Sequence, residues 1–274
     1  MFDNITYHLF KRWGDEMENV QQLRMKIRAN EFTKPTTGYG MDRLQANVVI
    51  LPKKYAYDFL LFCIRNPKPC PILEITDTGS PYIKKYSDDI IDIRTDVPKY
   101  RVFKNGEFVD EPLDIKDIWQ DDFVTFLLGC SFTFENELIN NGIPVKHINQ
   151  GKNVAMYITN IETEPAGSFR GNQVVSMRPF HYSLIPRVLE ITSRFPSAHG
   201  SPIHIGDPTQ IGIKDIHSPD FGDSIDIAEN EVPVFWACGV TPQVALLNSK
   251  PDITITHAPG HMLITDYPTA KLAR

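Results

Sequence analysis

The chain has 274 residues, of which 42% are hydrophobic and 23% charged, and its formal net charge is −6. This composition is typical of a soluble globular protein with a large core, and the negative charge argues against a general nucleic-acid binder, whose surface is basic. No apolar run approaches the length of a membrane span, and residues 1–4 lack the features of a secretory signal. We therefore expect a cytoplasmic protein without nucleic-acid or membrane partners. Its four cysteines, which are widely spaced, are expected to be reduced thiols: Cys63, Cys70, Cys130 and Cys238.

The first 75 residues alternate between helical and extended patterns. Apolar side chains at helical spacing predict a helix over residues 16–27. A buried strand is predicted over residues 45–52, an amphipathic helix over 53–63 and a short strand over 72–75. This order predicts an α/β layer with a parallel or mixed sheet.

The middle of the chain consists of shorter elements. Asn105 and Gly106 predict a hairpin turn in an exposed segment that ends at a boundary near Pro112. Beyond it, the patterns predict a helix over residues 134–140 and strands over 144–147, 154–159 and 174–179. Residues 113–180 are therefore expected to form a small α+β unit.

The last third predicts a helix over residues 184–193, strands over 225–227 and 232–236, and a helix that starts within 244–247. A further strand over 253–256 runs directly into a loop that carries two histidines. Ligands of open α/β sheets bind at strand-to-loop junctions of this kind.

Three loops combine glycine and proline with chemically active side chains. The first, residues 197–208, carries His199, His204 and Asp207. The second spans residues 236–243, and the third, residues 256–261, carries His257 and His261. Loops on a rigid scaffold often hold catalytic residues, so we expect these three loops to meet at one site.

The histidines and Asp207 are suited to acid–base chemistry, since a positioned imidazole or carboxylate can transfer protons near neutral pH. Taken singly, His257 or His261 could instead brace its loop. Imidazole and carboxylate also bind metals, which makes a divalent metal at His199, His204 and Asp207 an alternative. Their spacing matches no familiar metal motif, so the primary expectation is a site without a metal.

Cys130 and Cys238 each follow a predicted strand. Gly129, Cys130 and Ser131 would present a thiol or hydroxyl on a turn, where backbone N–H groups can bind an oxyanion. The alternative is that each cysteine is a small buried hydrophobic residue.

Four arginines flank breaks in the predicted structure, namely Arg28, Arg65, Arg178 and Arg194. A guanidinium is a natural clamp for a carboxylate, although surface ion pairs would explain some of the four. No GxGxxG motif follows a strand and no phosphate-binding loop is present, so nothing in the sequence indicates a nicotinamide cofactor or ATP.

Several long motifs carry a resemblance to a known family. They are residues 45–52 (QANVVILP), 62–71 (FCIRNPKPCP), 129–135 (GCSFTFE), 156–161 (MYITNI), 175–179 (VSMRP), 191–196 (ITSRFP), 205–208 (IGDP) and 257–262 (HAPGHM). With these motifs the chain resembles the YcsI-like hydro-lyase family, also called the D-glutamate cyclase family, from about residue 24 to 266. It departs from the family pattern at Ala29, where a glycine is usual, and in residues 34–39, which are normally richer in glycine.

The resemblance implies a lyase that converts D-glutamate into 5-oxo-D-proline and water. It also implies a larger three-layer α/β/α domain with a mixed sheet, expected over residues 1–112 and 181–274. A smaller two-layer α+β domain would be inserted at residues 113–180.

We therefore expect acid–base catalysis on a small amino or carboxylic acid, without an organic cofactor. His199 or His204, oriented by Asp207, is the expected base. Ser131 and backbone N–H groups around Cys130 would hold the oxyanion, and Arg178 or Arg194 would bind the α-carboxylate. The catalytic candidates are His199, His204, Asp207, Cys130, Ser131, Cys238, His257 and His261, and the substrate-binding candidates are Asn47, Arg65, Glu135, Arg178, Arg194, Thr241 and Gln243.

Two alternatives differ in chemistry. One is a metal-dependent hydroxy-acid dehydratase, and the other is a protein that binds a small carboxylate without turnover. A pure binding protein needs mainly hydrogen-bond donors, so the surplus of titratable groups favours an enzyme. A homo-oligomeric assembly is left open.

Overall fold

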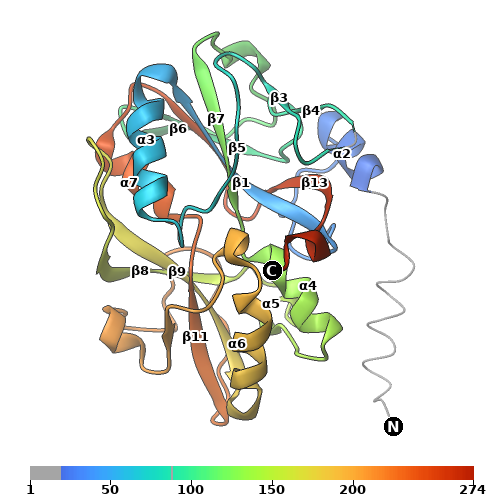
Figure 1. Cartoon of the computed structure of the whole chain (residues 1–274), viewed down its shortest axis with the longest axis vertical. Helices are drawn as coiled ribbons and strands as arrows, with labels where there is room; N and C mark the ends of the chain where they lie inside the picture. The colour runs from blue at the N-terminus through green and yellow to red at the C-terminus, as the bar shows by residue number, and fades with distance from the viewer. Residues whose placement is uncertain (1–19, 88) are drawn as a thin grey trace.

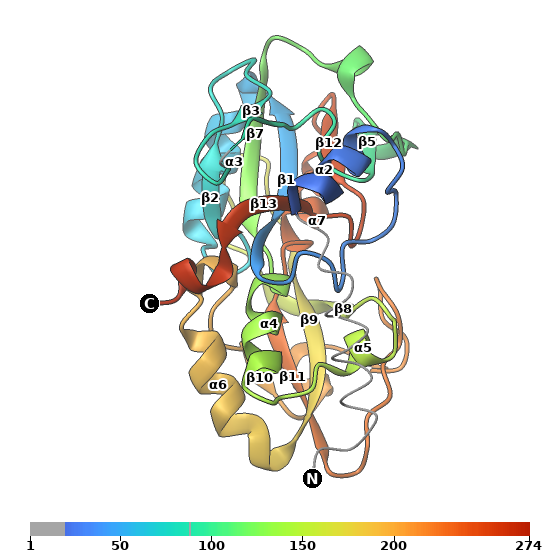
Figure 2. The same ribbon diagram turned by 90° about the vertical axis from the view of Figure 1, so that its right-hand side faces the viewer.

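Two β-sheets, one above the other, organise the molecule in the computed structural model, which describes residues 20–87 and 89–274 (Figures 1 and 2). The upper sheet has the strand order β2-β7-β1-β12-β5-β6, with β13 also paired to β1, and the lower sheet has the order β10-β11-β9-β8. The upper strands are β1 (Arg43–Pro52), β2 (Ile72–Ile75), β5 (Tyr100–Lys104), β6 (Glu107–Asp110), β7 (Phe123–Gly129), β12 (Thr254–His257) and β13 (Leu263–Pro268). The lower strands are β8 (Ala155–Glu162), β9 (Asn172–His181), β10 (His204–Ile205) and β11 (Glu231–Ala237), while β3 (Tyr82–Ile83) and β4 (Ile91–Asp92) form a separate pair.

The helices of the described residues lie around these sheets. They are α2 (Val20–Arg28), α3 (Lys53–Arg65), α4 (Phe132–Asn140), α5 (Lys146–Asn149), α6 (Ile185–Ser193) and α7 (Thr241–Ser249). Five short 3₁₀ turns complete them: η1 (Lys116–Ile118), η2 (Tyr182–Leu184), η3 (Pro196–Ala198), η4 (Pro208–Ile211) and η5 (Thr269–Leu272). The α/β class expected from the sequence is confirmed. Of these helices, none is long and apolar enough to cross a membrane.

Strand direction in the upper sheet differs from the expectation. Every strand pair recorded in the described residues is antiparallel, so the expected parallel or mixed pairing is wrong. The cause is β7, which pairs with β1 on one side and β2 on the other. Strands β1 and β2 run in the same direction, and α3 lies between them in the chain. In the sheet, however, β7 lies between them.

Strand β1 is buried on both faces because it lies in the middle of the upper sheet. Its alternate side chains point to opposite faces. Leu44 and Val48 face a core completed by the segment that contains β3 and β4. Val49 and Leu51 face a second core, in which Phe59 of α3 packs together with side chains of α7.

The lower sheet is also covered on both faces. Helices α4 and α6 pack on one face around Trp236, which is fully buried. The other face is covered by irregular chain that contributes Ile211, Ile213 and Ile225.

A third cluster lies where the two sheets meet, and we call it the junction. Strands β7, β11 and β12 end there, and each is followed by a loop rich in small residues. The buried members of the junction cluster are Cys130, Phe132, Val154, Met156, Val174, Cys238, Val240 and Met262.

Two predicted strands are wrong. Residues 144–147 lead into the single turn of α5, where Val145 packs in the α4–α6 core. Residues 225–227 are extended but unpaired, because Ile225 packs onto the face of the lower sheet and adds nothing to its edge. The predicted helix over residues 16–27 corresponds to α2, and its residues 16–19 lie outside the described residues.

The predicted domain boundaries stay a prediction, and strand pairing does not follow them. Strand β7 belongs to the predicted insert 113–180 in sequence, yet it lies in the upper sheet. Strands β10 and β11 belong in sequence to the predicted main domain, yet they pair with β9 in the lower sheet.

Candidate functional site

A cavity at the junction brings together the loops after β7, β11 and β12 and the segment that carries His199. The space between its walls measures about 390 Å³, part of it open to solvent. Its walls are formed by Asn47, Cys130, Ser131, Phe132, Asn153, Val154, Met156, His199, Cys238, Gly239, Val240, His257, Pro259, Gly260 and Met262.

Cys130 lies on the turn between β7 and α4. A side chain at Gly129 would bring its Cβ within 1.7 Å of the carbonyl oxygen of Ser197, so only glycine lets the His199 segment pack against this turn. The backbone N–H of Phe132 acts to lower the pKa of Cys130, but burial has the larger effect. Burial raises the pKa of Cys130 to about 12, which keeps it a thiol at neutral pH.

Cys238 occupies the corresponding turn between β11 and α7. Burial raises the pKa of Cys238 to about 11, and the backbone N–H of Val240 offsets part of that rise. Thr241 binds the backbone of Val174 through its hydroxyl, which accepts from the N–H at 2.9 Å. Thr241 thus fastens α7 to β9 and does not line the cavity.

Asn47 of β1 lies between the two cysteine turns. Its Nδ2 donates to the carbonyl oxygen of Gly129 at 2.7 Å. Gly239 also packs directly against this amide, since a Cβ added to Gly239 would lie 2.1 Å from the same nitrogen. One amide side chain therefore sets the spacing between the Cys130 and Cys238 turns.

His199 enters the cavity with a strained backbone, since its φ of 75° lies in the left-handed region that few non-glycine residues adopt. Its Nδ1 lies 2.7 Å from the carbonyl oxygen of Lys68. A carbonyl can only accept, so Nδ1 carries the proton and Nε2 is left as an acceptor. Burial lowers the pKa of His199 to about 4, which keeps the imidazole neutral.

His257, at the end of β12, meets both backbone groups of Val48 through Nδ1, so either neutral tautomer finds a partner. The backbone N–H of Val48 donates to its Nδ1 at 3.2 Å, and the Val48 carbonyl lies farther away at 3.4 Å. With Nδ1 as an acceptor, the neutral ring carries its proton on Nε2. Burial lowers the pKa of His257 to about 4. The cavity is thus lined by two neutral imidazoles, and His257 offers it a donor when Nδ1 accepts from Val48.

Arg178 lies behind the cavity wall and is fully buried. It forms an ion pair with Glu135 and donates to the Ser131 hydroxyl at 2.9 Å. Burial would raise the pKa of Glu135, but Arg178 and His147 together outweigh it, and the pKa is lowered. Arg178 does not line the cavity and its guanidinium is engaged by Glu135 and Ser131, so its role as a carboxylate clamp stays a prediction that this arrangement does not favour. It instead polarises Ser131, whose own O–H is left to donate.

His204 and Asp207 do not reach the cavity. After His199 the chain runs to the outer edge of the lower sheet, where β10 pairs with β11. His204 donates from Nε2 to the Asp207 carbonyl at 2.7 Å, and the Asp207 carboxylate accepts from the N–H of Thr209 at the start of η4. The predicted pairing of Asp207 with a catalytic imidazole is therefore wrong, since Asp207 caps a helical turn.

Several predicted substrate-binding residues also lie elsewhere. Arg65 is exposed and donates to the carbonyl of Pro165, and Arg194 is exposed at the end of α6. His261 is buried beside the third loop, where its Nδ1 lies 2.9 Å from the Pro259 carbonyl, and it does not line the cavity. Arg28 pairs with Asp96.

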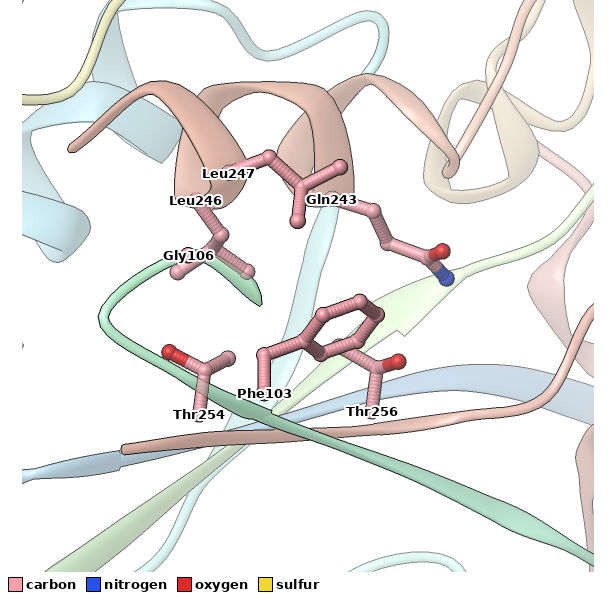
Figure 3. Close-up of a pocket in the computed structure, with 7 residues that line it drawn as sticks. All are labelled: Phe103, Gly106, Gln243, Leu246, Leu247, Thr254 and Thr256. Atoms are coloured by element: carbon pink, nitrogen blue, oxygen red, sulfur yellow. The ribbon is translucent and has the colours of Figure 1, made fainter. Parts of the chain in front are cut away.

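Gln243 lies at a second, smaller hollow between α7 and the strands β5 and β12 (Figure 3). Its amide extends from the helix above Thr256, and Phe103 lies beneath (Figure 3). This hollow of about 210 Å³ is lined by no titratable side chain, so it offers no acid–base chemistry.

Sequence reasoning missed much of the cavity wall. Met156 and Met262 contribute thioethers, and Asn153 lies across Gly260. Met156 and Met262 lie inside motifs of the family resemblance, but an apolar residue in a motif cannot be told from a core residue without the fold. In the part of the chain that the structure describes, no group of three or more His, Cys, Asp or Glu side chains is arranged to hold a metal ion.

The fold and site describe an α/β protein with a buried cavity lined by groups suited to acid–base chemistry. The family model described as "D-glutamate cyclase" matches residues 124–266, which include both cavity cysteines and both cavity histidines. The chain belongs to the D-glutamate cyclase family.

Relatives agree over nearly the full chain and carry hydro-lyase names. A "Putative hydro-lyase" of Thermoanaerobacter sp. (strain X514) is 59% identical over 93% of this chain and 97% of the relative. A second, from Psychrobacter arcticus, is 57% identical over 92% and 96%. "Putative hydro-lyase YcsI" of Bacillus subtilis is 55% identical over 92% and 98%. These names support the lyase class for the chain.

Among solved structures, a nitrogen repressor-like protein of Methanococcus jannaschii aligns with a TM-score of 0.38 at 11% identity, over 89% of this chain and 97% of that one. A likeness at this level establishes no shared fold.

Proposed function

We propose that the chain catalyses the cyclisation of D-glutamate to 5-oxo-D-proline and water in the junction cavity. The family description and the hydro-lyase names support the reaction class. The observation that carries the proposal is the pair of neutral imidazoles, His199 and His257, in the wall of one cavity. Cyclisation needs one group that takes a proton and another that gives one.

The first requirement is a free amine, since an ammonium cannot attack a carboxyl carbon. His199 Nε2 is the acceptor for the amine proton. The pKa of about 4 applies to the empty cavity. A substrate carboxylate beside the ring would raise that pKa, because a nearby negative charge favours the imidazolium.

The second requirement is polarisation of the side-chain carboxyl group. The Ser131 hydroxyl, which accepts from Arg178, and His257 Nε2 are the donors for its oxygens. As the nitrogen–carbon bond forms and the carbon–oxygen bond breaks, the nitrogen gives up two protons, one to His199 before the attack and one during it. Both are passed to the departing carboxyl oxygen, which leaves as water, and the two imidazoles return to their neutral forms. These steps proceed with the chain's own groups and require no organic cofactor or metal.

The substrate's α-carboxylate must find a partner in a wall that includes no lysine or arginine. The N-terminal end of α4 lies at Ser131, and helix N-termini attract anions. Arg178, directly behind Ser131, adds positive charge without entering the cavity. This arrangement favours one small carboxylate ligand over a larger polyanion.

The cavity must widen to admit this substrate. Much of the space between its walls is too narrow for a ligand larger than water. Because the walls come from both sheets, a small separation of the sheets would open the cavity. Closure around the substrate would then exclude bulk water, which strengthens the electrostatic interactions inside.

The test is to incubate the purified protein with D-glutamate and measure 5-oxo-D-proline by chiral chromatography. Wild type should form product, and His199→Ala should lose about 10²–10⁴-fold in rate, the usual range for a general base. The matched control is His204→Ala, which removes a histidine five positions along that lies outside the cavity and should keep the wild-type rate. Absence of product from wild type, or equal losses in both variants, would contradict the proposal.

A further inference from the structure

The proposed cyclisation uses neither of the two buried thiols that line the cavity, Cys130 and Cys238. Cys130 and Cys238 line the same cavity, one from the last turn of β7 in the upper sheet and one from the end of β11 in the lower sheet. Asn47 lies between their turns, in contact with Gly129 on one side and next to Gly239 on the other. The thiols are close enough for Cys238 to affect the ionisation of Cys130 and its pKa.

The two thiols also have the same local setting. Each follows a strand and precedes a helix, and the backbone N–H two positions along the chain acts to lower the pKa of each thiol. A hydrogen bond from N–H to sulfur stabilises the thiolate form. A reaction that removes a proton from a carbon and returns one to it needs two acid–base groups at one cavity, and these two thiols reach the same cavity from different sheets.

We propose that the junction cavity also exchanges the α-hydrogen of a bound α-amino acid, with Cys130 and Cys238 as the acid–base pair. The inference rests on the proposed function only in that the amino acid binds in the same cavity. The substrate class is a small α-amino acid with a side-chain carboxyl group, and the outcome is α-hydrogen exchange and interconversion of the two enantiomers.

The step balances within the cavity. One cysteine passes its thiol proton to Nε2 of His199 and becomes a thiolate. The thiolate takes the α-hydrogen as a proton, and the electron pair of the broken C–H bond stays on the substrate, delocalised into its carboxyl group. The opposite thiol gives its proton to the carbon, and His199 then returns its proton to that sulfur. No electron acceptor or donor is required.

The buried setting affects the strength of the base and its population in opposite ways. Because burial raises the pKa of Cys130 and Cys238, the thiolate is rare in the empty cavity, but once formed it is a strong base. The positive charge of Arg178 lowers both pKa values and partly offsets burial. The ammonium group of a bound amino acid adds a second positive charge and stabilises the thiolate further.

The experiment measures deuterium at the α-carbon. Wild type is incubated with D-glutamate, and separately with L-glutamate, in heavy water. The recovered amino acid and any 5-oxoproline are analysed by proton NMR and chiral chromatography. We expect α-deuteration from both enantiomers, and Cys130→Ser and Cys238→Ser should each slow it by about 10²–10⁴-fold, the contribution of a positioned acid or base.

The matched control is Cys63→Ala, which removes a buried thiol in the α3 core and should deuterate at the wild-type rate. Circular dichroism confirms that each variant is folded, and the wild-type result stands without any variant. Formation of 5-oxo-D-proline with no α-deuterium from either enantiomer would overturn this inference and leave the cyclase intact. Deuteration without 5-oxoproline would support the thiol pair and contradict the cyclase.

Discussion

The junction and the molecular surface use the same residue types for different purposes. His199 and His204 lie five positions apart, yet one is 1% exposed in the cavity wall and the other is half-buried at the edge of the lower sheet. The same contrast holds for ion pairs, since Arg178–Glu135 is buried behind the cavity and Arg187–Glu190 lies in solvent on α6. Burial is therefore what distinguishes the junction. It lowers the pKa of His199, and it makes the loss of one member of the Arg178–Glu135 ion pair more costly than at the surface.

The largest expected difference is between the two ion pairs. Arg178→Leu leaves the Glu135 carboxylate buried without its main partner, and loss of one member of a buried pair costs about 3–5 kcal/mol. Arg187→Leu, at a pair whose side chains are 49% and 63% exposed, should cost about 0–1 kcal/mol. Urea unfolding of both variants measures the two free energies. Equal values would show that burial does not separate the two pairs.

The pH dependence of stability tests the buried imidazoles. Since the pKa of His199 falls from 6.5 to about 4 on folding, the unfolded chain binds more protons between these values. Stability should then be fully present above pH 6.5 and decrease as the pH falls toward 4, by about 3 kcal/mol for this group. Unfolding free energies measured from pH 4 to 7 should show a shallower slope in His199→Gln than in wild type. His204→Gln serves as the matched histidine control, and an unchanged slope in His199→Gln would contradict the expectation.

The smallest expected effect compares two glycines. Gly129→Ala places a methyl 1.7 Å from the Ser197 carbonyl, and forced overpacking costs about 1–3 kcal/mol. Because the displaced segment carries His199, the rate of cyclisation should fall together with stability. Gly206→Ala meets no atom within 4 Å, although its φ of +96° adds a left-handed backbone cost of about 1 kcal/mol. Thermal unfolding and product formation, measured together, separate the two: an active Gly129→Ala enzyme would argue against its role in placing His199.

The prediction of individual elements depended on local pattern and was largely successful. Helix α3, strand β2 and the hairpin at Asn105 and Gly106 lie close to the residues predicted for them, because periodicity and turn chemistry are properties of neighbouring residues. The strand predicted at residues 144–147 was wrong because local pattern does not decide the conformation there. Val145 packs into a core contributed by distant helices, and this packing places the segment at α5.

The amino-acid sequence by itself determined the α/β class, the family, and the Gly- and Pro-rich loops that carry His199, Cys238 and His257. Only the tertiary structure decided which polar groups enter the cavity. His199 and His204 share one loop, and the chain turns away between them at the edge of the lower sheet. Arg178 forms a buried ion pair with Glu135 and does not line the cavity. Cys130 and Cys238, 108 positions apart, meet on either side of Asn47, because strand pairing and burial act between residues whose separation in the chain carries no information about their distance in space.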